Sequence, residues 1–362
     1  MNIYCLPSHT TKENTTGVDF ARMIQPMTHL NGYKNIKVDI YDPTIDEKHN
    51  NPIEWIDVMK NNQIFYFNYL NNPWGFAAMG MMARKEDVII VMDIDDDIWD
   101  IKTDNVAREV YHKGSSALGN FTSICNEVDY ITCTNDYLKH VIMNYTNKTH
   151  DRIKVFPNYI DLKTYKYKPP FKDDMQIVLT HFGSTTHFYD LDNIEFIKGM
   201  DRIMKEYPNV IFKTIGAFIQ EFREKWGQRY ENHFGHQDIH GWIDTKFPQF
   251  MEETDIMVVP LIDDVYNRCK SNIKWLEVSS AGKPGVWQDV RQYSECIDGR
   301  NGLLASKDTQ WYKAIKKLID DKQLRKEMGE NAYDDVRDNW QIQNNLEGYK
   351  QFFQKIVLDK SS

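Results

Sequence analysis

The sequence has few cysteines, no long apolar run and a deficit of basic residues. Its five cysteines are odd in number and include no Cys-x-x-Cys pair, which indicates free buried thiols rather than disulfides or a zinc site. No apolar run approaches the roughly 20 residues that a membrane-spanning helix needs. The first residues also lack the basic region and apolar stretch of a signal peptide. We therefore expect a soluble cytosolic protein.

The charge balance argues against one broad function class. The chain carries 44 Lys and Arg against 53 Asp and Glu, a net charge of -9. Non-specific nucleic-acid binding needs many basic side chains, so only a local basic groove would allow it.

The length and composition indicate how many domains to expect. The hydrophobic content of 41% is ordinary for a globular protein, and 362 residues are more than a single hydrophobic core usually holds. Two globular domains are therefore expected.

The most informative stretch runs from residue 256 to residue 284. A β-branched run at 256–259 predicts a buried strand that ends at Pro260. Apolar residues at helical spacing over 271–281 predict a helix with one buried side, which Gly282 ends. This spacing alone is equally typical of an ordinary helix behind a strand.

The loop between that strand and that helix suits an anion. Lys270, Ser271 and Asn272 stand at the predicted helix start, where free N–H groups and the helix dipole attract phosphate. The lysine adds a full charge. One turn further along the helix, Glu277 is placed to reach the hydroxyls of a sugar.

Here the sequence resembles a known family. The order strand, proline, polar loop, Lys-Ser, Lys-x-x-Glu and Ala-Gly-x-Pro is similar to the donor-binding segment of GT-B glycosyltransferases of the retaining, family-four-like group (glycosyl transferases group 1). The resemblance implies that Glu277 holds the ribose of a nucleotide sugar and that the loop before it, with Lys274, holds the diphosphate. A second family glutamate, eight residues earlier, is Cys269 here. This departure leaves the sugar specificity open, with Lys270 and Ser271 as substitute contacts.

A second glycine-containing loop belongs to the same expected donor site. Residues 177–187 predict a strand followed by a small-residue loop, where Gly183 and Ser184 allow backbone N–H groups to approach a phosphate. The arginine and lysine that the family often carries after this glycine are absent, so Lys270 or His187 must supply the charge. By resemblance, the nucleotide base lies near Gly216.

An acidic cluster ends the clearest strand of the first half. Residues 88–92 predict a strand that runs into five carboxylates within the eight residues 93–100. Such crowding needs basic neighbours, helix dipoles, a metal or raised pKa values. The family places a histidine near the acceptor here, so the resemblance gives Asp95 or Asp96 the catalytic place, with Lys270 stabilising the leaving group. An N-cap with solvated acids is the alternative, and GT-B enzymes generally need no metal.

Four further residues are candidates at the cleft of the first domain. Gly17 and Arg22 follow the first strand, in the loop and helix that face donor and acceptor in the family. Trp74 lies in a turn-rich loop at 71–75, where it is placed to stack on a sugar or a base, and His112 is a candidate acceptor-side base. A plain turn, a surface arginine, a core tryptophan and a structural histidine are the alternatives.

These observations predict an α/β protein of GT-B architecture, with two Rossmann-like domains facing a cleft. We expect an acceptor-side domain at 1–160, a nucleotide-sugar domain at 161–340, and a C-terminal helix at 341–362 packing back on the first domain. The resemblance implies transfer from a UDP-sugar or other nucleotide sugar with retention, and no tightly bound cofactor. The sequence does not indicate which sugar is moved or the oligomeric state.

The acceptor remains open. A saccharide is the default of the family. A hydroxymethylated pyrimidine in bacteriophage DNA is the alternative, because the Asn-, Lys-, Ile- and Tyr-rich composition suits an AT-rich genome. Rival functions are a sugar-nucleotide epimerase, a phosphorylase, which would need a lysine for pyridoxal, and a non-catalytic sugar-nucleotide-binding protein.

Overall fold

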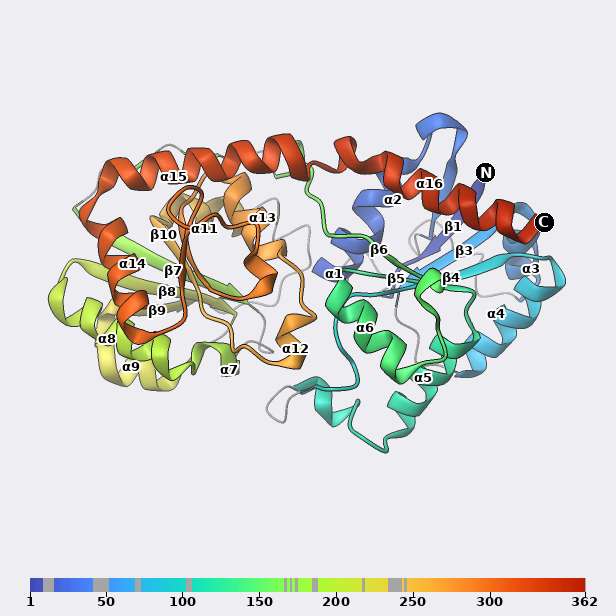
Figure 1. Ribbon diagram of the computed structural model, residues 1–362, viewed down its shortest axis with the longest axis horizontal. Coiled ribbons are helices and arrows are strands. Elements are labelled where there is room, and N and C mark those ends of the chain that lie inside the picture. Colours follow the sequence, from blue (N-terminus) through green and yellow to red (C-terminus); the bar gives the residue numbers. More distant parts are fainter. Residues whose placement is uncertain are drawn as a thin grey trace.

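Two parallel six-stranded sheets, each covered by helices, form the two halves of the molecule (Figure 1). The computed structural model describes residues 1–8, 16–41, 52–68, 73–101, 106–165, 168–169, 171–172, 175–183, 188–216, 219–233, 243 and 246–361. Both chain ends lie on the half that the N-terminal residues build.

The first sheet has the strand order β2-β1-β3-β4-β5-β6, and all neighbouring strands are parallel. Every residue of β3 and β4 is buried, as expected for central strands with helices on both faces. The strands are β1 (Asn2–Leu6), β2 (Lys37–Ile40), β3 (Ile64–Asn68), β4 (Ile89–Ile94), β5 (Tyr130–Cys133) and β6 (Ile153–Val155). The helices are α1 (Gly17–Asp19), a π-helical turn (Phe20–Ile24), α2 (Gln25–Leu30), α3 (Pro52–Asn61), α4 (Pro73–Lys85), α5 (Ser116–Glu127) and α6 (Asp136–Tyr145), with short 3-10 turns at Tyr33–Asn35, Val106–Glu109 and His150–Arg152.

The second sheet has the order β12-β11-β10-β7-β8-β9 and is also parallel throughout. Its strands are β7 (Ile177–Gly183), β8 (Val210–Gly216), β9 (Tyr230–His233), β10 (Ile256–Val259), β11 (Gly285–Gln288) and β12 (Leu303–Ala305). Its helices are α7 (Phe188–Leu191), α8 (Ile194–Glu206), α9 (Gln220–Trp226), α11 (Phe247–Glu253), α12 (Val265–Arg268), α13 (Ile273–Ser280), α14 (Asp308–Asp320) and α15 (Lys322–Asp335), with 3-10 turns at Gly227–Arg229 and Arg291–Tyr293.

One helix differs from its predicted environment. We expected α13 to have one buried side, but every residue from Lys274 to Ser280 is buried. Its apolar side chains join a core cluster with Val336 of the π-helical turn Val336–Trp340, and its polar side chains are covered as well. The helix therefore lies inside the protein with its charged residues enclosed.

The C-terminal helix α16 (Ile342–Ser361) lies along the first sheet, whereas α15 lies over the second (Figure 1). Tyr349 of α16 stacks on Phe156 with a ring centroid distance of 4.0 Å. The chain crosses between the domains twice, and the crossings are joined by backbone hydrogen bonds, from Ile160 N to Trp340 O (2.9 Å) and from Ile342 N to Ile160 O (3.0 Å). The two crossings therefore form one paired connection.

The five cysteines are all buried and unpaired, as predicted from their number and spacing. Within the described part of the chain, no helix combines the length and the apolar character that crossing a membrane requires.

Candidate active site

The loop of residues 269–272, which leads into α13, is held by the first domain. The amide of Asn135 donates to the backbone oxygens of Cys269 (2.8 Å) and Lys270 (3.1 Å). The Thr134 hydroxyl donates to the Cys269 oxygen at 3.3 Å. Asn135 also caps α6 by accepting from Leu138 N at 2.8 Å, so its side chain has a fixed orientation. The first domain therefore fixes the backbone of a loop that belongs to the second domain.

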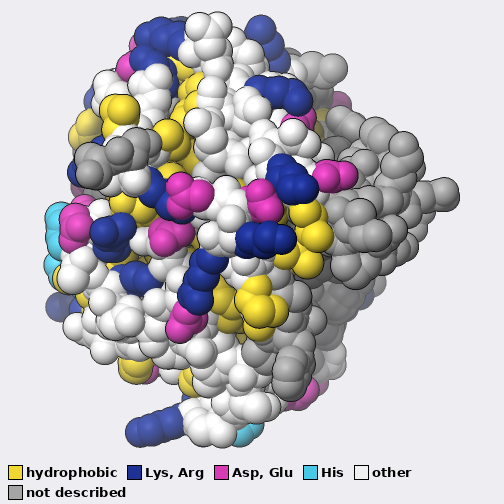
Figure 2. All heavy atoms as spheres, turned by 90° about the vertical axis from the view of Figure 1, so that its right-hand side faces the viewer, with side chains coloured by type: hydrophobic (Ala, Val, Ile, Leu, Met, Phe, Trp, Pro, Cys, Tyr) yellow, Lys and Arg dark blue, Asp and Glu magenta, His cyan; other side chains and the backbone are white. Residues whose placement is uncertain are grey.

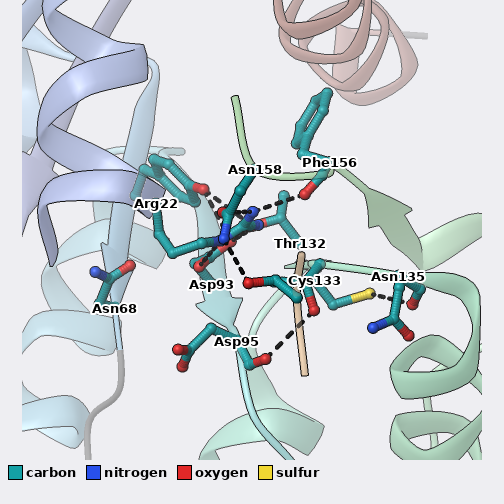
Figure 3. Close-up of polar contacts among 12 residues, drawn as sticks. Arg22, Asn68, Asp93, Asp95, Thr132, Cys133, Asn135, Phe156 and Asn158 are labelled. Atoms are coloured by element: carbon teal, nitrogen blue, oxygen red, sulfur yellow. Dashed lines mark hydrogen bonds and ion pairs between the residues drawn. The ribbon is translucent and has the colours of Figure 1, made fainter. Parts of the chain in front are cut away.

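A second anchor reaches the same loop through the domain crossing. The amide of Asn158 donates to the Ser271 hydroxyl at 2.8 Å, and its oxygen accepts from Arg22 at 2.9 Å. Arg22 in turn donates to both oxygens of Asp93 at 3.0 and 2.8 Å, and to the Phe156 carbonyl at 2.6 Å (Figure 3). A continuous line of hydrogen bonds thus runs from the end of β4 to the start of α13.

This network places Arg22, which we predicted on the acceptor side, in the packed interior of the first domain. Arg22 and Asp93 are 2% and 1% exposed, and Asp93 also accepts from the hydroxyls of Tyr66 and Thr132. The buried guanidinium compensates the buried carboxylate, so removing either partner would leave an uncompensated charge. It also explains how the first carboxylate of the acidic cluster is tolerated.

The remaining carboxylates of the cluster divide into two kinds. Asp97 is buried and accepts from the backbone N–H groups of Trp99 (2.9 Å) and Asp100 (3.1 Å), and burial raises its pKa to about 6. Asp95 and Asp96 are half-buried. Burial and the neighbouring charges of Asp96 and Asp93 raise the pKa of Asp95, whereas burial raises that of Asp96 against the opposing charge of Lys270. Asp96 and Lys270 therefore interact across the two domains.

Two lysines gather on the donor-segment side. The Lys270 ammonium lies 4.0 Å from an Asp190 carboxylate oxygen and 5.1 Å from the centroid of the Tyr266 ring. The Lys274 ammonium lies 5.9 Å from the Phe182 ring centroid. Burial, followed by the charge of Lys270, lowers the pKa of Lys274 to about 7. Both ammonium groups therefore lie in the segment from residue 270 to residue 274, at the start of α13.

Glu277 is enclosed one turn further along α13. It is 6% exposed and accepts a hydrogen bond from the Tyr165 hydroxyl at 3.0 Å. Burial and the Glu277 carboxylate raise the pKa of Tyr165, so this hydroxyl keeps its proton and donates. Tyr165, from the segment between the domains, therefore orients Glu277.

The other predicted donor residues lie at the carboxyl edge of the second sheet, as far as they are described. Gly183 and Gly216 are register partners at the ends of β7 and β8. Gly216 has φ +85°, a conformation that favours glycine. Ser184 and His187 are outside the residues whose placement is described.

Three candidates of the first domain form no hydrogen bond or ion pair with this loop within the described part of the chain. Gly17 is exposed at the start of α1, after the N-cap Thr16. His112 is exposed, with its Nδ1 3.3 Å from the Lys113 carbonyl oxygen. Trp74 is in the first turn of α4, and its side chain is outside the description.

A cavity of about 170 Å³ adjoins the loop on the side of the first domain. Its lining includes Asn135, Ser271, Arg291 and Glu295. Burial raises the pKa of Glu295, and Asn272 opposes this by hydrogen bonding. The sequence analysis missed Asn135, Arg291 and Glu295, although an asparagine is a common helix N-cap and Asn135 caps α6. Among the described residues, no group of three or more His, Cys, Asp or Glu side chains is placed to hold a metal.

The comparisons with known proteins agree with this geometry. Residues 177–321 match the family Glycosyl transferases group 1. The structure is similar to Anabaena HepE in complex with UDP-glucose (TM-score 0.66, 13% identity, 98% of this chain and 100% of that chain). It is equally similar to sucrose-phosphate synthase from Thermosynechococcus elongatus (TM-score 0.66, 11% identity, 99% and 100%). A putative UDP-N-acetylglucosamine 2-epimerase from Listeria monocytogenes is less similar (TM-score 0.52, 12% identity, 98% and 97%). No curated protein sequence matches the chain.

The whole-chain similarity establishes the GT-B fold, which confirms the predicted architecture. The match to Glycosyl transferases group 1 lies within the second domain, on the part of the chain that carries the loop of residues 269–272 and helix α13.

Proposed function

We propose that the chain transfers a sugar from a nucleoside diphosphate sugar, with UDP-glucose as the first donor to test, to an acceptor hydroxyl with retention. The observation that carries this proposal is Lys270, which stands before the start of α13 and is in electrostatic contact with Asp96 of the other domain, together with Lys274 in the first turn of α13. Two ammonium groups and helix N–H groups suit a leaving diphosphate. HepE, which has the same fold, was crystallised with UDP-glucose.

Each proposed contact has a distinct role. Lys270, Lys274, Ser271 and the N-terminus of α13 stabilise the charge that develops on the diphosphate as the glycosidic bond breaks. Glu277, oriented by Tyr165, accepts from the ribose hydroxyls. Asp95 and Asp96 orient the acceptor hydroxyl on the side of the first domain. Asn135 and Asn158 hold the loop in place before the donor binds, which lowers the ordering cost of binding.

The acceptor that the surface favours is a saccharide rather than duplex DNA. Figure 2 shows the end of the first domain, where lysine and arginine side chains alternate with acidic ones. The net charge of the chain is -9. A duplex acceptor needs a continuous basic surface, and the described residues on this end of the first domain present mixed charges instead (Figure 2).

The test of the proposed function is a panel of nucleotide sugars with mass detection of the products. We expect one donor to be consumed and its sugar transferred, and Glu277→Ala to raise the donor KM about 10- to 100-fold through loss of charged hydrogen bonds. Glu221→Ala, an exposed position on α9, is the matched control and leaves KM unchanged. An isomerised donor with no transfer would indicate an epimerase instead. Absence of any donor binding or cleavage would refute the proposal.

Donor binding is also expected to depend on pH through Lys274. Its pKa of about 7 is lowered from the usual lysine value, so the free protein loses this positive charge as pH rises through 7. A bound diphosphate favours the protonated form, so affinity for UDP should fall as pH rises from about 7.5 to 9, where the phosphate groups (pKa about 6) are already ionised. Calorimetry in two buffers of different ionisation enthalpy should show proton uptake. Lys274→Met should bind UDP more weakly and without this uptake; unchanged uptake in the variant would assign the proton elsewhere.

A further inference from the structure

A second cavity, of about 350 Å³, lies in the second domain at the edge of the sheet opposite the proposed donor site. Asp255 directly precedes β10, and Lys283 and Pro284 directly precede β11, so the cavity adjoins the amino ends of these strands. The donor loop follows the carboxyl end of β10. The two sites are therefore on opposite edges of one parallel sheet.

The lining of this cavity is basic, although the chain as a whole is acidic. Four lysines and two acids contribute charged side chains, a formal excess of two positive charges, against -9 for the chain. The charged residues are Lys168, Lys172, Lys283, Lys326, Asp255 and Glu330. A concave surface of this charge concentrates anions.

Lys283 is the unusual member of this set. It is 7% exposed, yet none of the described residues forms an ion pair with its ammonium. Asp255 and Glu252 act on it only as more distant charges, and burial lowers its pKa to about 8. The Asp255 carboxylate accepts from Val178 N at 2.8 Å and is thereby tied to the sheet. A buried ammonium without a close partner is costly, and the cavity beside it is where an anionic partner fits.

Next to Lys283, helix α15 packs very closely against the backbone of Gly282. Gly282 has φ +67°, and a Cβ at Gly329 of α15 would lie 2.1 Å from the Gly282 carbonyl oxygen. Only glycine at position 329 allows α15 to come this near, and α15 carries Lys326 to the rim. Phe171, 39% exposed, and Pro284 add apolar surface to the lining.

We propose that this pocket binds a small phosphorylated molecule, whose phosphate pairs with Lys283 and Lys172 and whose carbon skeleton lies against Phe171 and Pro284. A lysine ammonium group binds phosphate as a point charge. The cavity is larger than a single phosphate group, which leaves room for the rest of the molecule. Helix α13 joins the two sites, because it begins at the donor loop and ends three residues before Lys283. The pocket therefore has the position of an effector site and not of a second donor site.

The test uses pyrophosphate as the probe, titrated calorimetrically into protein saturated with UDP so that the donor site is occupied. We expect the wild type to bind pyrophosphate, and Lys283→Gln to weaken binding at least tenfold. Lys198→Gln, an exposed lysine on α8, is the matched control and should bind as the wild type does. Lys172→Gln, at a half-buried position, should weaken binding several-fold and serves if Lys283→Gln does not fold. Equal binding by Lys283→Gln and wild type, or no binding by UDP-saturated wild type, would overturn the proposal. If UDP itself does not bind, pyrophosphate titrated alone still distinguishes Lys283→Gln from the wild type, so the proposed function and this pocket fail separately.

Discussion

Replacing Arg22 by methionine is expected to lower the free energy of unfolding by about 3–5 kcal/mol. The guanidinium and its partner Asp93 are 2% and 1% exposed, so the change leaves a carboxylate buried without a cation. The hydroxyls of Tyr66 and Thr132 still donate to Asp93, but they do not neutralise its charge. The Phe156 carbonyl and the Asn158 side chain lose their donor at the same time.

Urea unfolding, followed by far-UV circular dichroism, measures this loss. The matched control is Arg84→Met, which removes an ion pair to Glu127 with side chains 66% and 53% exposed. Exposed pairs contribute about 0–1 kcal/mol, so the control should change the midpoint little. Arg22→Met with Asp93→Leu removes the unpaired charge and should recover part of the lost stability. Similar midpoints for Arg22→Met and Arg84→Met would mean that the buried pair does not stabilise the fold.

The regular elements of the fold were predictable where local sequence specifies them. The β-branched run at 256–259 became β10, with the same bounds as the predicted strand. Strand β11 has only four residues, directly after Gly282-Lys283-Pro284, and is too short to show a hydrophobic alternation in the sequence. The enclosure of α13 was not predictable, because Lys274 and Glu277 are covered by elements distant in the chain and not by a local apolar pattern.

The candidate site shows the same division. The loop and helix residues from Lys270 to Glu277 were found from their order along the chain. The partner of Asp93 was not found from the sequence. Arg22 is 71 residues away from Asp93, and its local sequence is equally typical of an arginine on the surface of a helix. Asn158 and Ser271 are separated by 113 residues, and only the folded chain brings them within hydrogen-bonding distance. Sequence order identified the groups that bind anions, and the fold identified the groups that position them.

Replacing Lys270 by alanine is expected to reduce kcat about 100- to 1,000-fold, since it removes a full charge beside the leaving diphosphate of the proposed reaction. Lys270 lies between carboxylates of both domains, 4.0 Å from Asp190 and in electrostatic contact with Asp96. Without the lysine, both carboxylates repel the donor, so KM should rise as well. Steady-state kinetics with the donor identified by the panel measure the two effects, and Lys198→Ala on the exposed face of α8 is the control.

The double variant Lys270→Ala with Asp96→Asn separates these two effects. Neutralising Asp96 removes one source of repulsion, so the donor KM should return toward the wild-type value. The kcat should stay low, because the charge that stabilises the departing diphosphate is still missing and because Asp96→Asn also removes a carboxylate proposed to orient the acceptor. A Lys270→Ala variant with raised KM and unchanged kcat would show that the lysine contributes equally to substrate and transition state. In that case Lys274, the other ammonium on this segment, would become the group that stabilises the leaving diphosphate.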